Sequence, residues 1–453
     1  RLSNTSGDVR VCPDHLAVTT FLSKPSGCAG GVGAGDTLCR NKLGGVYCRA
    51  CSAEFEHDHF YHTAARECLE CTQSMPRGVW VLLSLLCCAA LALLVGQFSR
   101  GRLQLVLAKI LDLVRTISSS SIVASLVVTT KTLLSFFQIV SEVEEVFIME
   151  LPLKAVRFIK SFSWLDLSIT DLIQLECLRL GGYLNELQLT AALPVLLLLL
   201  LAVYSLTYEA AVEKKRGWEL ARGTALRALP LILFVTFLVV PDVSSLAFQS
   251  FRCECFGDES WLRADYSLQC SVGGCDTEHF TDTYLRTRRT AWAVLWVYAL
   301  GVPCVYAALL FHERRTIMDE EHTPLADALA FLHGGFRPAC YWWELVSFGQ
   351  KLFAVGFATL IMPGKLMQLM IVMLVMIVFL LLLVVVKPSK SRAFAVLALV
   401  EQIALLYFFV VCFIVKTEQL ALAVDPMWMT DRVYKAFFYN TELISVTMLS
   451  TLV

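Results

Sequence analysis

The sequence predicts an all-α polytopic membrane bundle of about nine transmembrane helices, preceded by a small disulfide-rich extracellular module. Three observations predict this fold class. Hydrophobic residues make up 57% of the 453 residues and charged residues only 17%, whereas soluble domains carry about 25% charge. The apolar residues gather into runs of about 20, the length that a helix needs to cross a bilayer. The joints between the runs alternate in basic charge and in cysteine content. A soluble fold is thereby excluded, and the net charge of -1 gives no indication of a nucleic-acid partner.

Seven apolar runs are long enough to cross a bilayer as single helices. They occupy residues 78–98, 190–212, 224–247, 290–312, 341–362, 366–386 and 393–415. Two weaker runs complete the set: residues 103–147 begin amphipathic and contain Lys131, and residues 434–453 reach the last residue given. Residues 77–453 are therefore predicted to form the transmembrane domain. Because the sequence starts at Arg1 without a methionine and stops within an apolar run, we expect a longer protein, with further chain before Arg1.

The charges of the joints predict the orientation of the bundle. Short loops that carry Lys and Arg stay on the cytoplasmic side during insertion. If the N-terminus lies outside, four basic joints all fall on the cytoplasmic side: residues 100–115, 213–216, 313–315 and 387–392. Arg286, Arg288 and Arg289 then lie outside, in a longer loop to which the rule applies less strongly. We therefore predict an extracellular N-terminus.

The cysteines divide between the two sides in the same way. Of the 17 cysteines, twelve fall in segments that the alternation places outside. They are Cys12, Cys28, Cys39, Cys48, Cys51, Cys68, Cys71, Cys177, Cys253, Cys255, Cys270 and Cys275. The others lie within runs or at their cytoplasmic ends. Because the cell exterior is oxidising, we predict that these twelve form disulfide bonds, and the pairing is left open.

Two further features of the first segment bear on its chemistry. The spacing Cys48-x-x-Cys51 followed by Cys68-x-x-Cys71 is also that of a zinc ribbon, and histidines lie between the two pairs. A metal is thus an alternative to disulfides, but a segment that leads into an outward-facing span favours disulfides, and we predict no metal site. Asn4 begins an Asn-Thr-Ser glycosylation sequon, which also favours an extracellular position.

Three extracellular segments follow from the same alternation. Residues 1–76 have too few apolar residues to bury a core, so their fold is expected to depend on disulfide bonds. Residues 151–188 are too long for a turn and too apolar to lie free in water. Short helices along the outer membrane surface, or capping the bundle, satisfy both conditions. Residues 250–288 contain four of the cysteines and are predicted to form a disulfide-braced loop.

Polar side chains within the apolar runs are the candidate functional residues. A charge in hydrocarbon costs at least about 2.5 kcal/mol on insertion scales, so each needs a partner or a water-filled cavity. Glu344 and Lys351 are seven residues apart and share one face of a helix, which Glu401 and Gln402 of a later run can oppose. These four residues are predicted to line a hydrated path. A purely structural ion pair between Glu401 and Lys351 is the alternative.

Two other features of the runs have structural interpretations. Tyr341, Trp342 and Trp343 begin a run at its cytoplasmic end, where aromatic rings prefer the headgroup layer, so we expect them to be membrane anchors. Gly301 and Pro303 interrupt another run, and a proline within a span frees backbone carbonyls. This interruption is the expected position of a hinge.

Two sets of motifs resemble known families. Just before the first run, residues 47–51 (YCRAC) and 67–71 (ECLEC) resemble the cysteine-rich repeat of ephrin-receptor-like ectodomains. A second set resembles large multi-pass proteins of algae, oomycetes and other protists: residues 251–255 (FRCEC), 261–270 (WLRADYSLQC), 298–303 (YALGVP) and 341–345 (YWWEL). The membrane region of those proteins is usually compared with transient receptor potential (TRP) like channels and fungal flavin carriers. The resemblance covers roughly residues 40–453.

The resemblance implies a membrane bundle with a channel-like role, in the plasma membrane or a ciliary membrane, and an ectodomain that continues before Arg1. One departure matters: TRP channels have a pore loop before their last helix, whereas residues 416–432 are short and lack a filter-like cluster of glycine and acid. The leading prediction is a cation channel or sensor with a disulfide-stabilised cap. A non-conducting anchor for a large extracellular assembly and a carrier of lipid or another small molecule are the alternatives.

An enzyme is not predicted. Catalysis needs a nucleophile, a metal set or paired acids in one pocket, and the sequence presents no such set. His312, His322 and His333 recur between two runs, but the acidic residues 319–321 beside them are typical of a solvated turn. We expect no cofactor. The lipid bilayer is the expected partner, together with further N-terminal chain or an extracellular protein, and oligomerisation is left open.

Overall fold

The structure is a computed structural model, and it describes residues 27–29, 35–40, 42–52, 59–62, 67–71, 121–149, 151–160, 181–211, 213, 216–272 and 279–424. Within these residues, five helices are long and apolar enough to cross a membrane. They are α7 (Tyr183–Ala211), α8 (Gly217–Gln249), the continuous helix of α9 (Asp282–Leu295) and α10 (Val302–His312), α15 (Leu366–Val386) and α16 (Arg392–Val424). Helices of membrane-spanning length are thereby confirmed at five of the nine predicted runs. The runs at 78–98 and 434–453 lie outside the described residues.

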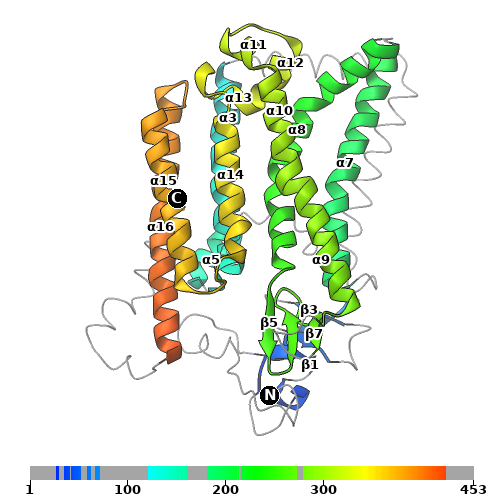
Figure 1. Ribbon diagram of the computed structural model, residues 1–453, viewed down its shortest axis with the longest axis vertical. Helices are drawn as coiled ribbons and strands as arrows, with labels where there is room; N and C mark the ends of the chain where they lie inside the picture. The colour runs from blue at the N-terminus through cyan, green and yellow to red at the C-terminus, as the bar shows by residue number, and fades with distance from the viewer. Residues whose placement is uncertain are drawn as a thin grey trace.

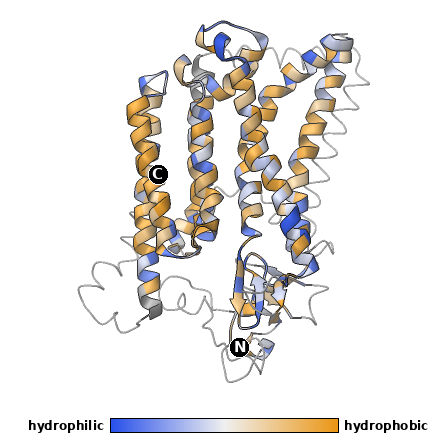
Figure 2. Ribbon diagram, viewed as in Figure 1, coloured by the Kyte–Doolittle hydropathy of each residue, from blue (hydrophilic) through white to orange (hydrophobic). Residues whose placement is uncertain are grey.

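The surface of the bundle is apolar along its middle. The long helices stand side by side, and hydrophobic residues cover their central sections while hydrophilic residues gather toward the ends (Figure 1, Figure 2). Large apolar side chains point outward, among them Leu199 of α7, which is 58% exposed, and Val385 of α15, which is 77% exposed. Soluble proteins rarely expose contiguous apolar surface of this extent. A position within a lipid bilayer accounts for it, because lipid tails cover such side chains without cost.

One end of the bundle, the basic end, carries two of the predicted basic joints. Three short helices form a cap there: α11 (Arg314–Met318), α12 (Pro324–Ala328) and α13 (Ala330–His333) (Figure 1). The joint that follows α15 meets this cap. Arg337 N–H donates to Pro388 O at 2.8 Å, and Lys390 Nζ lies 3.2 Å from Glu320 Oε1. The two joints therefore lie together, although they are far apart in the sequence.

The opposite end, the cysteine-rich end, carries the described β-structure (Figure 1). Its strands are β1 (Leu43–Gly44), β2 (Ala50–Cys51), β3 (His59–His62), β4 (Glu67–Glu70), β5 (Cys253–Phe256), β6 (Glu259–Leu262) and β7 (Gln269–Val272). They form two antiparallel pairs, β1 with β2 and β3 with β4, and a three-stranded antiparallel sheet in the order β5-β6-β7. The N-terminal module and the segment after α8 thus share one end of the molecule.

Tyr47 joins the N-terminal module to the β5-β6-β7 sheet. Its hydroxyl donates to Glu254 Oε1 at 3.0 Å, and its ring meets the rings of Phe256 and Tyr266 edge-on, with centroids 5.4 and 5.5 Å away. The Tyr266 hydroxyl donates to Glu254 Oε2 at 2.7 Å, and burial raises the pKa of Tyr266 above its ordinary value. Aromatic pairs of this geometry add to the stabilisation from burial alone. They hold the two cysteine-rich segments against each other.

The separation of the two ends predicts opposite accessibility for two exposed residues. Asp258, between β5 and β6, lies at the cysteine-rich end, and His322, before α12, lies at the basic end. In intact cells, Asp258→Cys is expected to react with a membrane-impermeant maleimide, whereas His322→Cys is expected to react only after permeabilisation. The unsubstituted chain controls for the exposed thiol of Cys304. The reverse pattern would contradict the predicted orientation.

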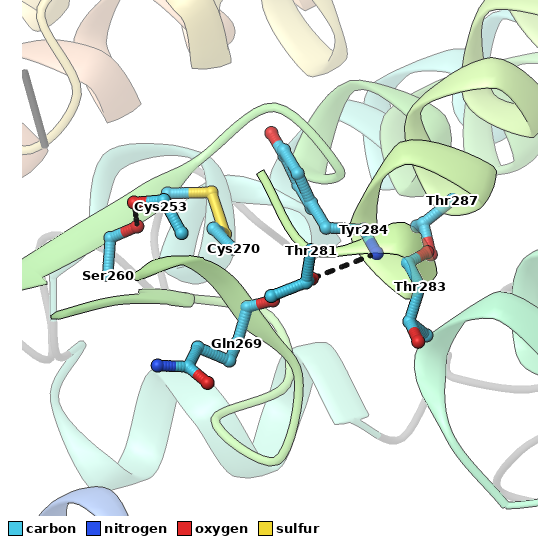
Figure 3. Close-up of a disulfide and its surroundings, with 9 residues drawn as sticks. Cys253, Ser260, Gln269, Cys270, Thr281, Thr283, Tyr284 and Thr287 are labelled. Carbon is cyan, nitrogen blue, oxygen red and sulfur yellow. Dashed lines mark hydrogen bonds between the residues drawn. A yellow bond between two sulfur atoms is a disulfide. The ribbon is translucent and has the colours of Figure 1, made fainter. Parts of the chain in front are cut away.

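The segment at 250–288 contains three strands and the start of a helix, and so has more regular structure than the loop that the sequence predicts. After the sheet, α9 already starts at Asp282, because the Thr281 side chain caps it: Oγ1 accepts a hydrogen bond from Tyr284 N–H at 3.3 Å (Figure 3). The three arginines expected in the loop therefore lie on the first turns of a helix. Thr281 Oγ1 also donates to Gln269 O of β7 at 2.6 Å, so the start of α9 is fixed to the sheet.

The run at 341–362 forms a shorter helix than predicted. Its helix, α14, spans Trp343–Val355. These 13 residues extend about 20 Å, less than the ~30 Å of a hydrocarbon core. The helix ends at Gly356, where a Cβ atom would come within 2.6 Å of the Phe248 ring, so α8 packs closely against the backbone there. A 3-10 turn, Phe357–Leu360, follows.

Trp343 is a core residue and not the membrane anchor that the sequence predicts. It is 3% exposed, and its ring lies against Phe379 of α15 with centroids 5.6 Å apart. Its neighbour Trp342 is 38% exposed. Consecutive residues of a helix point to different sides, so only one of two adjacent tryptophans faces the core. The sequence does not show which one, because that depends on how α14 packs.

The run at 103–147 is described from residue 121 onward. It contains α3 (Ser121–Ser141) and α4 (Val143–Phe147), and α5 (Leu153–Lys160) follows. Ala155 and Ile159 of α5 are buried in the hydrophobic core that α3, α15 and α16 share. Within the described residues, the segment predicted at 151–188 thus begins as a helix that caps the bundle. Residues 161–180 lie outside the described residues.

A π-helical turn, Trp296–Gly301, joins α9 to α10. Pro303 follows two residues after Gly301, and it has no N–H with which to continue the regular hydrogen-bond pattern. Gly301 permits the wider turn, because a Cβ atom there would lie 3.1 Å from Trp296 O. Turns of this kind are rare inside α-helices and are frequent at functional sites. The position at which the sequence predicts a hinge is therefore one where the helix is irregular.

Candidate functional site

Two parallel helices, α3 and α14, bring buried polar side chains together inside the bundle. Lys131 and Gln138 are seven residues apart on α3, and Glu344 and Lys351 are seven apart on α14. Lys131 contacts Glu344, and Gln138 contacts Lys351, so both contacts join residues 213 positions apart. From the first contact to the second, the residue number rises by seven on both helices, so α3 and α14 run parallel. The alternation of sides requires this of the second and sixth predicted spans. We call these two contacts the polar ladder.

The first contact of the ladder is an ion pair. Lys131 Nζ lies 2.6 Å from Glu344 Oε2, and the two side chains are 10% and 4% exposed. Nζ also donates to Phe331 O at 3.1 Å and lies over the rings of Phe331 and Phe336, 5.1 and 5.4 Å from their centroids. A carboxylate, a carbonyl and two aromatic faces thus replace the water that the ammonium loses on burial.

The second contact joins a charge to an amide. Lys351 Nζ donates to Gln138 Oε1 at 2.7 Å and lies 3.9 Å from the centroid of the Phe237 ring. Gln138 Nε2 in turn donates to Leu238 O of α8 at 2.7 Å. Asp242, one turn further along α8, acts electrostatically on Lys351. Three helices therefore surround this lysine, which is 2% exposed.

An amide pair lies beside the ladder and joins three helices. Gln350 Nε2 of α14 donates to Gln402 Oε1 of α16 at 3.0 Å. Gln402 Nε2 donates to Met376 O of α15 at 3.1 Å. Buried amides are tolerated when their donors and acceptors are satisfied in this way. Gln402, predicted to face a hydrated path, is 3% exposed and serves as a link between helices.

Glu401 is placed differently from the other three predicted path residues. It is partly exposed, and it interacts electrostatically with Lys351 and Glu344. Within the described part of the chain, no hydrogen bond or ion pair joins it to Lys351, so the structural ion pair considered for these two residues is not formed. The predicted set is brought together in part: Glu344 and Lys351 belong to the ladder, Gln402 lies beside it, and Glu401 acts on Glu344 and Lys351 electrostatically without a direct contact.

Sequence reasoning did not find Gln138, although a signal for it was present. Lys131 and Gln138 repeat on one run the seven-residue spacing of Glu344 and Lys351 on another. Matched spacing of polar residues in two apolar runs is what facing parallel helices require. Lys416 of α16 was also missed. It is 6% exposed, and its Nζ donates to Ile148 O at the end of α4.

The cysteines of the described residues separate into bonded and free sets. The bonds are Cys39–Cys48, Cys51–Cys68 and Cys253–Cys270, and Cys28, Cys71 and Cys255 are disulfide-bonded as well. The free thiols are Cys304, Cys340 and Cys412, which the sequence places outside the disulfide set. The prediction of disulfide bonds is thereby confirmed. Cys12, Cys177, Cys275 and the sequon at Asn4 lie outside the described residues.

The disulfides occupy the sulfur atoms that the zinc-ribbon alternative requires. Cys48 and Cys51 are bonded to Cys39 and Cys68, so the two Cys-x-x-Cys pairs do not share one tetrahedral site. Among the residues that the structure describes, no group of three or more His, Cys, Asp or Glu side chains is placed to hold a metal. Figure 3 shows the Cys253–Cys270 bond, which joins the two outer strands of the β5-β6-β7 sheet.

Comparison with known proteins does not place this chain in a family. No protein-family model, no curated protein and no solved structure matches it.

Proposed function

We propose that this chain is the membrane region of a TRP-like multi-pass protein that works as a cation channel or sensor, with the cysteine-rich end outside the cell. The observation that carries the proposal is the polar ladder. Ionisable side chains inside a membrane are expensive, and they mark ion or proton pathways and moving helices. Here two lysines and a glutamate are held between two parallel helices, and none of the three is more than about a tenth exposed.

In this proposal the ladder is the closed state of a gate. Both contacts are satisfied, so α3 and α14 resist separation. Movement of α14 away from α3 breaks the Lys131–Glu344 pair and opens the carboxylate to water. Glu401, which already interacts electrostatically with Glu344 and Lys351, then becomes a second carboxylate on the path. Carboxylates along a hydrated path attract cations and repel anions, which gives the proposed selectivity.

The β5-β6-β7 sheet at the cysteine-rich end has a physical connection to α14. Gln269 of β7 is bonded to Thr281, which caps α9, and the helix continues through the π-helical turn into α10. On α10, the Tyr306 ring lies 5.9 Å from Phe348 of α14. We propose that displacement of the β5-β6-β7 sheet reaches α14 along this route, with the π-helical turn as the hinge. A ligand or a force on the outer module is the stimulus that this arrangement suits.

Current recordings from the purified full chain in planar bilayers test the proposal. Glu344→Gln is expected to raise the open probability, because it removes the ion pair from the closed state only. Each 1.4 kcal/mol lost from that state shifts the equilibrium about tenfold. Glu320→Gln is the matched control: it makes the same charge change at an exposed pair with Lys390, and no shift is expected. Equal effects of the two variants would contradict a gate at the ladder.

A non-conducting anchor is the second candidate, and the packing around Lys351 favours it. The Phe237 and Phe348 rings lie against Nζ, with centroids 3.9 and 5.8 Å away, so the ladder also serves to fix the register of α3 and α14. In that case the docked outer module is the point of attachment for an extracellular assembly. Absence of current from the folded wild type and from Glu344→Gln, under voltage and under membrane tension, would favour the anchor.

A further inference from the structure

Arg252 is a buried arginine whose guanidinium is only partly satisfied. It follows the end of α8, is 7% exposed, and donates from Nη1 to Glu145 O at 3.2 Å. Its Nε and Nη2 atoms are buried, and neither forms a hydrogen bond with any residue that the structure describes. Buried donors of a charged group are costly when unmet, typically by a few kcal/mol. A site that leaves two of them open at one residue therefore calls for an explanation.

The two open nitrogens lie on one edge of the guanidinium plane. The N–H of Nε and one N–H of Nη2 point in the same direction from that edge. This is the arrangement that binds two oxygens of a carboxylate or a phosphate at once, and it is a feature that lysine lacks. The unmet hydrogen bonds of Arg252 are thus a matched pair, with the geometry of an oxyanion receptor.

Two other basic side chains, Arg263 and Lys416, lie near Arg252. Burial, and secondly the positive charge of Arg263 in the segment after β6, lower the pKa of Arg252 to about 10. Arg252 and Arg263 both act electrostatically on Lys416 of α16. Among the acids, Glu145 has the largest electrostatic effect on Arg252, and its carboxylate also accepts a hydrogen bond from Gln249 Nε2 at 3.2 Å. Arg263 is paired with Glu254, with Nη1 3.4 Å from Oε2, whereas Nε and Nη2 of Arg252 have no hydrogen-bond partner among the described residues.

From this geometry we propose that Arg252, with Lys416 beside it, binds a phosphate-type oxyanion where α8, the end of α4 and α16 meet at the cysteine-rich end. Two N–H groups of Arg252 hold two oxygens of the anion, and Lys416, which already donates to Ile148 O, supplies a further charge. The anion joins three helices and offsets the repulsion that the arginines exert on Lys416. Its source is either the headgroup of an anionic phospholipid or free phosphate, since both present the same oxygens.

Thermal unfolding of the purified full chain tests the site. In a neutral detergent, inorganic phosphate is added to the wild type, to Arg252→Met and to Arg286→Met, which removes an exposed arginine of α9 at the same end. Phosphate is expected to raise the Tm of the wild type and of Arg286→Met. The apparent phosphate affinity of Arg252→Met is expected to fall by about tenfold or more, because the bidentate contact is lost.

A second measurement distinguishes the source of the anion. The same three proteins are placed in nanodiscs of phosphatidylcholine, with and without phosphatidylglycerol. Stabilisation by phosphatidylglycerol but not by inorganic phosphate identifies a lipid headgroup, whereas stabilisation by inorganic phosphate identifies a soluble anion. Either result supports the site, provided that Arg252→Met abolishes it.

A purely structural role for Arg252 gives a different result. Arg252→Met would then lower the Tm by the same amount with and without either anion, and this outcome would overturn the proposal. Arg252→Lys covers the case in which the methionine variant does not fold. It keeps the charge but lacks the paired N–H edge, so weaker anion stabilisation than in the wild type is expected. Anion stabilisation of Arg252→Lys equal to that of the wild type would equally overturn a bidentate site.

Discussion

Replacing Glu344 by leucine is expected to lower the free energy of unfolding by about 3–5 kcal/mol, because it leaves the buried charge of Lys131 without its partner. Nζ of Lys131 keeps only the Phe331 carbonyl and two ring faces, which do not balance a full charge. Lys131→Met is expected to cost a similar amount, since it isolates a carboxylate that is 4% exposed. Reversible unfolding of the purified protein in mixed detergent micelles measures both changes.

The double variant Lys131→Met with Glu344→Leu distinguishes the net contribution of the ion pair from the cost of leaving one buried charge unpaired. Removing both charges takes away the attraction and the desolvation cost together, so its stability is expected to lie near that of the wild type or above it. Glu320→Leu is the control, because its pair with Lys390 is 61% exposed on both sides and is worth at most about 1 kcal/mol. A Glu344→Leu effect no larger than that of Glu320→Leu would rule out a buried ion pair.

Removing the Cys253–Cys270 disulfide is expected to cost about 3 kcal/mol. The bond closes a loop with a sequence separation of 17, and in the chain-entropy account a loop of this length restricts the unfolded chain by about that amount. The double variant Cys253→Ala with Cys270→Ala tests this by equilibrium unfolding. We also expect faster proteolysis within the sheet, because the bond joins its two outer strands.

The free thiol of Cys304 supplies the control for that experiment. Cys304→Ala removes an exposed sulfur of α10 that forms no disulfide, so the free energy of unfolding is expected to stay nearly unchanged. If the Cys253/Cys270 double variant matched Cys304→Ala in stability, the sheet would be held by its hydrogen bonds and by Tyr47 docking alone. The disulfide would then make no measurable contribution to the stability of the β5-β6-β7 sheet.

The membrane-spanning helices could be predicted because lipid imposes a length and a composition that the sequence displays directly. The length of α14 could not be predicted, because a helix packed inside the bundle can be as apolar as a spanning helix without crossing the membrane. Gly356 follows its last residue and lies close to Phe248 of α8, and no local pattern reveals that approach. The start of α9 was signalled by Thr281, a capping residue whose role the sequence analysis did not use.

The candidate site was predictable in part for a similar reason. Glu344 and Lys351 share a face because seven residues make two turns, which is a local rule. Their partners on α3 depend on which helices pack together, and that is decided by the whole bundle. Glu401 and Gln402 show the limit of the local rule: they are adjacent in the sequence, but Glu401 is partly exposed and Gln402 is buried.

The equal spacing of the two contacts between α3 and α14 makes sliding of these helices directional. If α14 advanced by seven residues, about 10 Å, toward the cysteine-rich end, Glu344 would come level with Gln138, whose amide can still donate to it. The same step toward the basic end would bring Lys351 level with Lys131, and two ammonium groups would face each other in an apolar interior. A slide in either direction therefore breaks the Lys131–Glu344 pair, but only a slide toward the basic end also brings two like charges together.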